Sequence, residues 1–255
     1  MKSAKSLDKY IGTNTLVAHR GFQAKYPENT VLSLIKAIEL GALYIELDIQ
    51  FSLDKLPIIY HDDTLERVSG VTGSVFEQNR DDLLTLSAFE PGRLGETFLD
   101  QTIAPLEDLV DILHDHPQVT AFVELKAESI AHCGRELMIS QVQRILSSVA
   151  KQTVLMSFDY ELANIAHKAS WPSIGVVLER WSDLDSLAVK TAAPDYIFAD
   201  HQIIPEDHKI LHSPAHQDTI LVAYEVGNKA LAQSLLDRNV DMLETYQLEN
   251  LLTES

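Results

Sequence analysis

Short apolar segments alternate with stretches of helical periodicity along almost the whole of this chain. The apolar segments are residues 16–18, 43–45, 58–60, 121–123, 153–156, 174–178, 196–198, 220–224 and 242–243. Segments of this kind are typical of strands buried in a parallel sheet, and the helical stretches between them indicate right-handed βαβ units. The alternation therefore predicts an α/β fold with a parallel sheet.

The length of the chain favours one way of closing this sheet. A TIM-type (β/α)8 barrel needs about 250 residues, and the chain has 255. Nine segments compete for eight barrel strands, so at least one of them is no strand or lies outside the barrel. Helical patterns cover residues 31–38, 137–149, 160–169, 184–189 and 229–236. We expect one barrel domain over residues 1–255.

The alternation breaks once, between residues 62 and 104. This stretch contains Gly70, Gly73, Pro91, Gly92 and Gly95, shows little periodicity, and is too long for an ordinary loop between a strand and a helix. We interpret it as an inserted subdomain after the third strand that forms a wall of the substrate pocket. The alternative is a surface excursion without a role.

The net charge of −18 excludes some classes of partner. No basic stripe is present to displace counterions from nucleic acid, and an acidic protein is repelled by anionic lipid. We therefore expect no nucleic-acid binding and no stable membrane association. A small-molecule substrate remains, and any phosphate group must be captured by local positive charge.

Cysteine usage and the start of the chain bear on the compartment. Cys133 is the only cysteine, so no intramolecular disulfide can form, and a reducing compartment fits. Residues 1–12 are polar without the apolar core of a secretory signal. No apolar stretch approaches the ~20 residues of a membrane span. We expect a cytoplasmic protein.

Ionisable residues follow the first apolar segments closely. Glu46 and Asp48 lie two residues apart beside one strand, so their side chains share a face. Two carboxylates this close repel unless a cation lies between them, and hard divalent ions prefer carboxylate oxygen. Glu124 and Lys126 repeat the spacing at another strand. The alternative is that these are solvated charges at strand ends.

Two histidines and an arginine accompany these carboxylates. His19 and His61 come from different segments, and imidazole titrates near neutral pH, so the pair suits general acid and base catalysis. Arg20 offers a planar fork of donors that matches two phosphate oxygens. Alone, each histidine would more often be structural and Arg20 a partner in a surface salt bridge. Together they indicate one site that binds a metal and a phosphate.

These residues form an ordered series of motifs. They are His19-Arg20-Gly21, Pro27-Glu28-Asn29-Thr30, Glu46-x-Asp48, His61-Asp62 and Glu124-Leu125-Lys126, with Leu65, Arg67, Pro105-Leu106-Glu107 and Ser157-Phe158 in support. In this respect the chain resembles the glycerophosphodiester phosphodiesterases. The resemblance is dense over residues 16–73 and thinner, but still in order, to about residue 158.

The resemblance implies a metal-dependent hydrolase that releases sn-glycerol 3-phosphate and an alcohol from a glycerophosphodiester. It implies the following roles: Glu46, Asp48 and Glu124 bind one divalent cation, Mg²⁺ or Ca²⁺; His19 and His61 act as base and acid, in an order that the sequence leaves open; Arg20 and Lys126 bind the phosphate; and Tyr224 lies beside the substrate. Glu28 would order the loop next to His19, and Asn29 or Thr30 would cap the following helix.

The C-terminal part departs from the family pattern. Glu225 and Glu244 stand near the expected rim of the pocket, next to Tyr224. One hypothesis is that the two carboxylates favour cationic alcohols, with the Tyr224 ring facing a quaternary ammonium. The alternative is that both are solvated charges of an acidic protein.

Two further functions compete with the glycerophosphodiesterase. A lysophospholipase D-like enzyme would need an apolar groove or a membrane-facing patch, and the net charge counts against it. A non-catalytic barrel that binds phosphate metabolites would be expected to lose histidines or metal ligands. Release of choline from lysophosphatidylcholine, or absence of glycerol 3-phosphate release with any metal, would discriminate these alternatives. The sequence does not indicate the oligomeric state.

Overall fold

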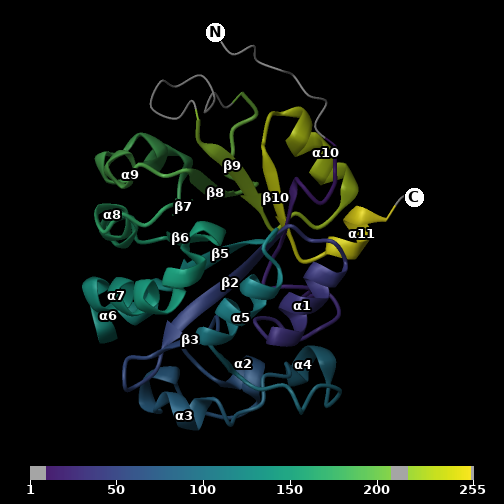
Figure 1. Cartoon of the computed structure of the whole chain (residues 1–255). Helices are drawn as coiled ribbons and strands as arrows, with labels where there is room; N and C mark the ends of the chain where they lie inside the picture. Colours follow the sequence, from purple (N-terminus) through teal and green to yellow (C-terminus); the bar gives the residue numbers. More distant parts are fainter. Residues whose placement is uncertain (1–9, 208–217, 254–255) are drawn as a thin grey trace.

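Eight parallel strands close into a barrel in the computed structural model, which describes residues 10–207 and 218–253 (Figure 1). The barrel strands are β1 (Leu16–Ala18), β2 (Tyr44–Phe51), β5 (Thr120–Leu125), β6 (Thr153–Ser157), β7 (Ile174–Leu178), β8 (Tyr196–Asp200), β9 (Ile220–Tyr224) and β10 (Met242–Thr245). Closure is complete because β1 pairs in parallel with both β2 and β10. The predicted TIM-type α/β barrel is confirmed.

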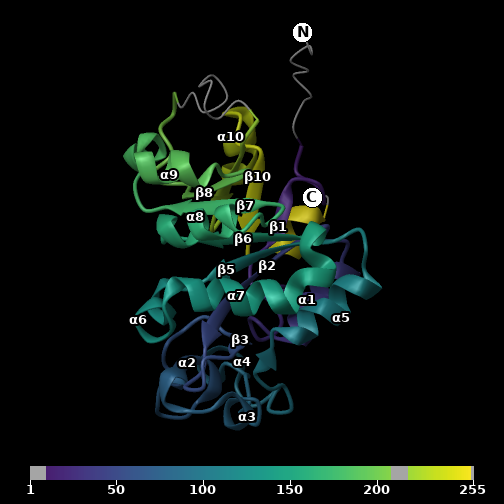
Figure 2. The same cartoon turned by 60° about the vertical axis from the view of Figure 1, so that its left-hand side comes forward.

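Helices surround the barrel and cover its outer face (Figure 2). They are α1 (Val31–Glu39), α5 (Glu107–Asp115), α6 (Ile130–Cys133), α7 (Arg135–Leu146), α8 (Tyr160–Lys168), α9 (Leu187–Ala192), α10 (Lys229–Asp237) and α11 (Leu248–Leu252), with 3₁₀ turns η2 (Ala127–Ser129), η3 (Ser147–Gln152) and η4 (Trp181–Asp185). The helix expected over 184–189 is divided at Ser186, whose side chain caps α9 by accepting a hydrogen bond from the Val189 amide. No helix in the described ranges is both long and apolar enough to cross a bilayer.

The segment at residues 58–60 is not the parallel barrel strand that its apolar pattern predicted. It lies in β3 (Pro57–Ile59), which pairs antiparallel with β2 and places Ile59 opposite Ile49. Strand β2 continues to Phe51 instead of ending at residue 45, as the apolar segment suggested. Only five residues therefore connect β2 to β3. A connection this short makes a hairpin, since a parallel crossover needs a dozen residues or more. The ninth candidate strand therefore lies outside the barrel.

The hairpin opens the inserted subdomain, which begins with β3, a little earlier than residue 62. It contains α2 (Glu66–Ser69), η1 (Val75–Glu77), α3 (Arg80–Leu83) and α4 (Pro91–Leu94), and ends at β4 (Ala104–Pro105), antiparallel to β3. It packs around an apolar core of its own, made of Ile58, Tyr60, Leu65, Val68, Val75, Leu83, Ala88 and Ile103. Both views show it as a lobe at the end of the molecule away from β8 and β9.

Alternation along the strands separates the barrel interior from the outer core. On β2, Ile45, Leu47 and Ile49 pack in the outer cluster with the helices, while Tyr44 packs against the interior cluster. Side chains of a strand alternate between faces, so Glu46 and Asp48 share the interior face with Tyr44. The interior cluster consists of Val17, Phe122, Val154, Met156, Val177, Phe198, Val222 and Met242. These apolar side chains form a floor beneath charged residues nearer the carboxyl ends of the strands, where barrels carry their chemistry.

Candidate active site

Three of the predicted metal ligands meet inside the barrel. Asp48 on β2 lies opposite Glu124 on β5 in the strand register, and Glu46 precedes Asp48 on the same face. One carboxylate oxygen from each lies within 4.8 Å of the others. All three residues are buried. They lie within their strands, rather than beyond the strand ends as the short apolar segments suggested, because β2 and β5 extend past those segments.

The electrostatics of this cluster fit a bound cation. Burial raises the pKa of Glu46 well above its usual value, and the neighbouring charges of Asp48, Glu244 and Glu124 add to the effect. Among the described residues, Glu46 Oε1 has no hydrogen-bond partner. Buried carboxylates that repel one another, with an oxygen left unpaired, match the oxygen ligands that hard divalent ions prefer.

Asp48 stays ionised because fixed positive charges surround it. Burial acts to raise its pKa, but Arg20 and Lys126 outweigh burial and lower the pKa to about 2. Arg20 Nε lies 3.1 Å from Asp48 Oδ2, and Lys126 Nζ lies 3.6 Å from Asp48 Oδ1. Asn29 holds the same residue by donating to Oδ2 at 2.8 Å and accepting from its amide at 3.1 Å. Lys126 also donates to Glu124 Oε1 at 2.8 Å.

The turn after β1 requires glycine next to Arg20. Arg20 has φ 53° and Gly21 has φ 80°, so two successive residues lie in the left-handed region. A Cβ on Gly21 would lie 2.6 Å from the Ser33 carbonyl carbon. Ser33 also donates through Oγ to the Arg20 carbonyl at 3.0 Å. This close approach turns the chain sharply, and the positive φ of Arg20 is the kind of backbone strain that gathers at functional sites.

Glu28 orders the loop beside His19, as expected from the sequence. It is 1% exposed and accepts hydrogen bonds from Arg20 at 3.0 Å and from Arg67 at 2.6 and 2.9 Å. Burial opposes ionisation, but the hydrogen bonds from Arg67 and the charge of Arg20 lower the pKa of Glu28. Of the two expected caps, Thr30 is the one used, in a capping box with Ser33 at the start of α1.

His19 is buried and faces two carboxylates. Its Nε2 lies 3.5 Å from Glu244 Oε1 and 4.0 Å from Glu46 Oε2, and its backbone amide donates to the Thr245 carbonyl on β10. Within the described part of the chain, Nδ1 has no hydrogen-bond partner. Burial, followed by the charge of Arg20, lowers the pKa of His19 to about 3. Burial therefore favours the neutral ring over the charged one.

His61 reaches the site from the inserted subdomain. Because β3 runs back along β2, the residues that follow it return toward Glu46 and Asp48. His61 Nδ1 lies 2.6 Å from Asp62 Oδ1, and Arg67 Nε donates to Asp62 Oδ2 at 2.7 Å. Burial acts to raise the pKa of Asp62, but the hydrogen bonds from His61 and Arg67 hold it well below its usual range. The sequence reading noted Asp62 only as part of a motif and missed this contact.

The expectation that Glu244 lies at the pocket rim was wrong. Glu244 is 5% exposed and lies on the interior face of β10, two residues after the interior side chain of Met242. Burial and the charges of Glu124 and Asp48 raise its pKa well above the usual value. Period-two alternation from Met242 would have placed it inside. Glu225 is exposed, with φ 55°, and does lie at the rim.

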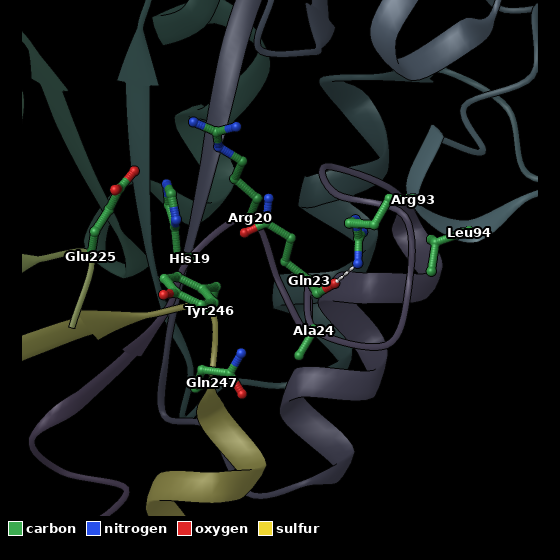
Figure 3. A pocket seen from close by; sticks show the side chains of 9 residues that line it. All are labelled: His19, Arg20, Gln23, Ala24, Arg93, Leu94, Glu225, Tyr246 and Gln247. Atoms are coloured by element: carbon green, nitrogen blue, oxygen red, sulfur yellow. Dashed lines mark hydrogen bonds between the residues drawn. The ribbon is translucent and has the colours of Figure 1, made fainter. Parts of the chain in front are cut away.

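Two cavities meet at this site. The smaller, of about 170 Å³, is lined by His19, Arg20, His61, Glu124, Lys126, Met156, Phe158, Val177, Phe198, Tyr224, Glu225 and Glu244. The larger, of about 480 Å³, is lined by His19, Arg20, Gln23, Ala24, Arg93, Leu94, Glu225, Tyr246 and Gln247 (Figure 3). Of the residues that the structure describes, His19, Arg20 and Glu225 alone line both. The smaller cavity is thus lined by every predicted site residue, Tyr224 included, except Glu46 and Asp48, which lie buried next to Glu124.

Figure 3 shows how the larger cavity is built. The Glu225 carboxylate, the His19 ring and the Tyr246 ring line one side of it, and Arg93 with Leu94 closes the opposite side. Arg93 donates to the carbonyl of Gln23 and forms an ion pair with Glu90. Arg93 and Leu94 belong to α4, so the inserted subdomain contributes a wall of the pocket.

Comparisons with known proteins all point to one family. The model of the "Glycerophosphoryl diester phosphodiesterase family" matches residues 19–247. The chain is 25% identical over 244 residues to a glycerophosphodiester phosphodiesterase of Caldanaerobacter subterraneus, covering 93% of this chain and 96% of that protein. It is 32% identical over 122 residues to human glycerophosphodiester phosphodiesterase 1, covering 48% and 36%.

Solved structures share the fold. An Oleispira antarctica phosphodiesterase, solved with the product sn-glycerol-3-phosphate, superposes with a TM-score of 0.77 at 21% identity over 93% of this chain and 94% of that one. A Silicibacter pomeroyi structure has a TM-score of 0.78 at 19% identity, with 93% and 91% covered. The family match spans most of the chain and contains every predicted site residue. The chain belongs to the glycerophosphoryl diester phosphodiesterase family.

Proposed function

We propose that this chain hydrolyses glycerophosphodiesters to sn-glycerol 3-phosphate and an alcohol, with a divalent cation held by Glu46, Asp48 and Glu124. Membership of the family makes it a phosphoric diester hydrolase with glycerophosphodiester phosphodiesterase activity. The observation that carries the assignment to particular residues is the meeting of this carboxylate cluster with His19 and His61 around one cavity.

The cation site takes Mg²⁺ or Ca²⁺, because its three ligands offer only carboxylate oxygen. When bound, the cation supplies positive charge that polarises a phosphoryl oxygen. Arg20 and Lys126 add fixed positive charge on the same side of the cavity, where the pentavalent transition state concentrates negative charge. Their ion pairs with Asp48 hold both side chains in place before substrate arrives.

The surroundings of the two histidines support a division of labour. Burial favours the neutral form of His19 and the residue lines the cavity, so we assign to it the proton of the attacking hydroxyl, either of water or of the glycerol 2-position. Asp62 accepts the hydrogen bond from Nδ1 of His61 and complements the charge of the doubly protonated ring. His61 therefore donates a proton to the departing alkoxide. A diester with a poor leaving group needs both transfers.

The two cavities accommodate the two halves of the diester, and Arg20 and His19 lie where the cavities adjoin. The hollow of about 170 Å³ has an apolar wall and lies over the carboxylate cluster, and it receives the glycerol phosphate. The hollow of about 480 Å³ receives the alcohol. Tyr224 bounds the first, and Glu225 lies where the two join. The single cysteine supports a cytoplasmic place of action.

The test is release of glycerol 3-phosphate from several glycerophosphodiesters after chelation and readdition of Mg²⁺, Ca²⁺ or Mn²⁺. We expect cation-dependent activity that Asp48→Asn reduces by at least about a hundredfold. The change removes a cation ligand and also the carboxylate that forms an ion pair with Arg20. Asp115→Asn, on the exposed face of α5, is the matched control. No release with any cation would favour the non-catalytic binding barrel. If choline release from lysophosphatidylcholine is faster than glycerol 3-phosphate release from the glycerophosphodiesters, the lysophospholipase D-like enzyme is favoured.

A further inference from the structure

Glu244 completes a second group of ligand atoms beside the first. One atom each from His19, Glu46 and Glu244 lies within 4.8 Å of the others, and all three residues are buried. The distance from His19 Nε2 is 3.5 Å to Glu244 Oε1 and 4.0 Å to Glu46 Oε2. Separations of this size are those between neighbouring ligands of one ion, since metal–ligand bonds of about 2.0–2.2 Å place adjacent ligand atoms roughly 3 to 4 Å apart.

The group lacks the partners that a purely structural role would give it. Among the residues that the structure describes, Glu46 Oε1 and His19 Nδ1 have no hydrogen-bond partner, and Glu46 is 1% exposed. In the same part of the chain no lysine or arginine side chain forms an ion pair with Glu46 or Glu244. Arg20 meets Glu46 only through its backbone amide. Buried carboxylates without a cationic partner are costly, and a divalent ion held by these oxygens would remove that cost.

The charges of the site lead to the same conclusion. Four buried carboxylates, Glu46, Asp48, Glu124 and Glu244, face the side-chain cations Arg20 and Lys126. Arg20 is shared with Glu28 as well. A single divalent ion therefore only balances the four carboxylates against these two cations, so a second cation next to Glu244 meets no net positive charge from them.

The two ligand groups differ in chemical preference. Glu46, Asp48 and Glu124 offer only oxygen, which suits Mg²⁺ and Ca²⁺. His19, Glu46 and Glu244 offer one imidazole nitrogen and two carboxylates, and imidazole favours Zn²⁺ and related first-row ions. We propose that His19, Glu46 and Glu244 form a second divalent-cation site, selective for Zn²⁺-like ions, which adjoins the first through Glu46.

The site has a functional consequence that rests on the proposed role of His19. An ion bound to Nε2 occupies the lone pair that would accept a proton from the attacking hydroxyl. Zn²⁺ therefore inhibits hydrolysis while Mg²⁺ or Ca²⁺ supports it. Glu244 is the residue that separates inhibition by Zn²⁺ from support by Mg²⁺ or Ca²⁺. It is a ligand of the second group alone and takes no part in the proton transfers.

Binding is tested without activity, on the full chain freed of metal. Wild-type protein saturated with Co²⁺, a first-row ion with higher affinity than Mn²⁺ for nitrogen ligands, is expected to hold two ions per chain and to show the electron paramagnetic resonance spectrum of a coupled pair. Calorimetry with Zn²⁺ in excess Mg²⁺ should give one Zn²⁺ site, and Glu244→Gln should weaken it at least about tenfold. Glu225→Gln removes a carboxylate from the same cavity outside both groups and should weaken Zn²⁺ binding far less than Glu244→Gln does. A single ion in the wild type, or equal affinity in Glu244→Gln, overturns the proposal.

Inhibition is measured separately, as the Zn²⁺ concentration that halves each protein's own Mg²⁺-supported activity. We expect this concentration to rise at least about tenfold in Glu244→Gln and much less in Glu225→Gln. If Zn²⁺ binds as expected without inhibiting, the second site stands and the role of His19 as base fails. If Mg²⁺-supported activity depends on His19 and no Zn²⁺ binds, the second site fails and the proposed function stands. The wild-type ion count decides the matter even if a variant does not fold.

Discussion

Replacing Asp62 by asparagine tests whether His61 is an oriented acid. The carboxylate lies 2.6 Å from Nδ1 of His61 and is held from the other side by Arg67 at 2.7 Å. An amide in this place keeps the shape but offers a donor to Nδ1, which stabilises the tautomer with its proton on the wrong nitrogen. It also removes the negative charge that complements the doubly protonated ring. Asp62 is thus a positioning residue that acts through His61.

The size of the effect follows from these two losses. A wrong tautomer alone lowers kcat by about four orders of magnitude in the serine-protease triad, where the partner aspartate is fully buried. Asp62 is less enclosed, with 18% of its side chain exposed, so we expect kcat to fall by about two to three orders of magnitude. The substrate KM should change little, because Asp62 is not among the residues that line either cavity.

The assay is steady-state hydrolysis of a glycerophosphodiester across pH 5 to 9. Asp63→Asn, one residue further on and exposed, is the matched control and should keep wild-type rates. We expect Asp62→Asn to lower kcat across this range at nearly unchanged KM. A structural role for Asp62 would instead raise KM or lower thermal stability. A kcat within threefold of wild type would refute the reasoning.

Three further outcomes follow from the same contacts. Glu28→Gln should lower the free energy of unfolding at pH 7 by about 2 kcal/mol, less than the ~3–5 of a fully buried pair because Arg67 is 45% exposed. The folded pKa of Glu28 is lowered, so its contribution is present above the unfolded value of about 4.3 and is lost as pH falls through the folded pKa; denaturant titrations of both proteins should converge in acid. Mg²⁺ at about 100 times its dissociation constant should raise the free energy of unfolding of the metal-free protein by about 2.7 kcal/mol in thermal melts, and Asp48→Asn should abolish this gain. Glu225→Gln should lower the ratio of kcat/KM for glycerophosphocholine to that for glycerophosphoglycerol; an unchanged ratio would leave Glu225 a solvated charge.

The parallel strands could be predicted well from the sequence because their burial on two faces leaves a continuous apolar run. The predicted length of β2 failed for an instructive reason. Its second half carries Glu46, Asp48 and Gln50 on the interior face, so the apolar run ends at Ile45 while the strand continues to Phe51. The functional residues themselves interrupt the pattern that reveals a strand. That error concealed the hairpin to β3 and made residues 58–60 resemble a barrel strand.

The candidate site was predictable where ligands stand two apart on a strand, as Glu46 and Asp48 do. Contacts between distant segments were not. Asn29 holds Asp48 from a loop, and Glu28 joins Arg20 to Arg67 of the inserted subdomain. Such pairings depend on how loops fold over the barrel, which periodicity does not encode. Glu244 was misplaced for a different reason, since the alternation that puts it inside was available in β10 and was not applied.

The rate at which the His19→Ala variant releases glycerol 3-phosphate tests the central claim most directly. The proposed function assigns the acceptance of a proton to His19, which lines both cavities. With saturating Mg²⁺ or Ca²⁺, the variant should lose at least about a hundredfold in kcat, while His114→Ala on the exposed face of α5 should match the wild type. Activity of His19→Ala within a few-fold of the wild type would contradict the account.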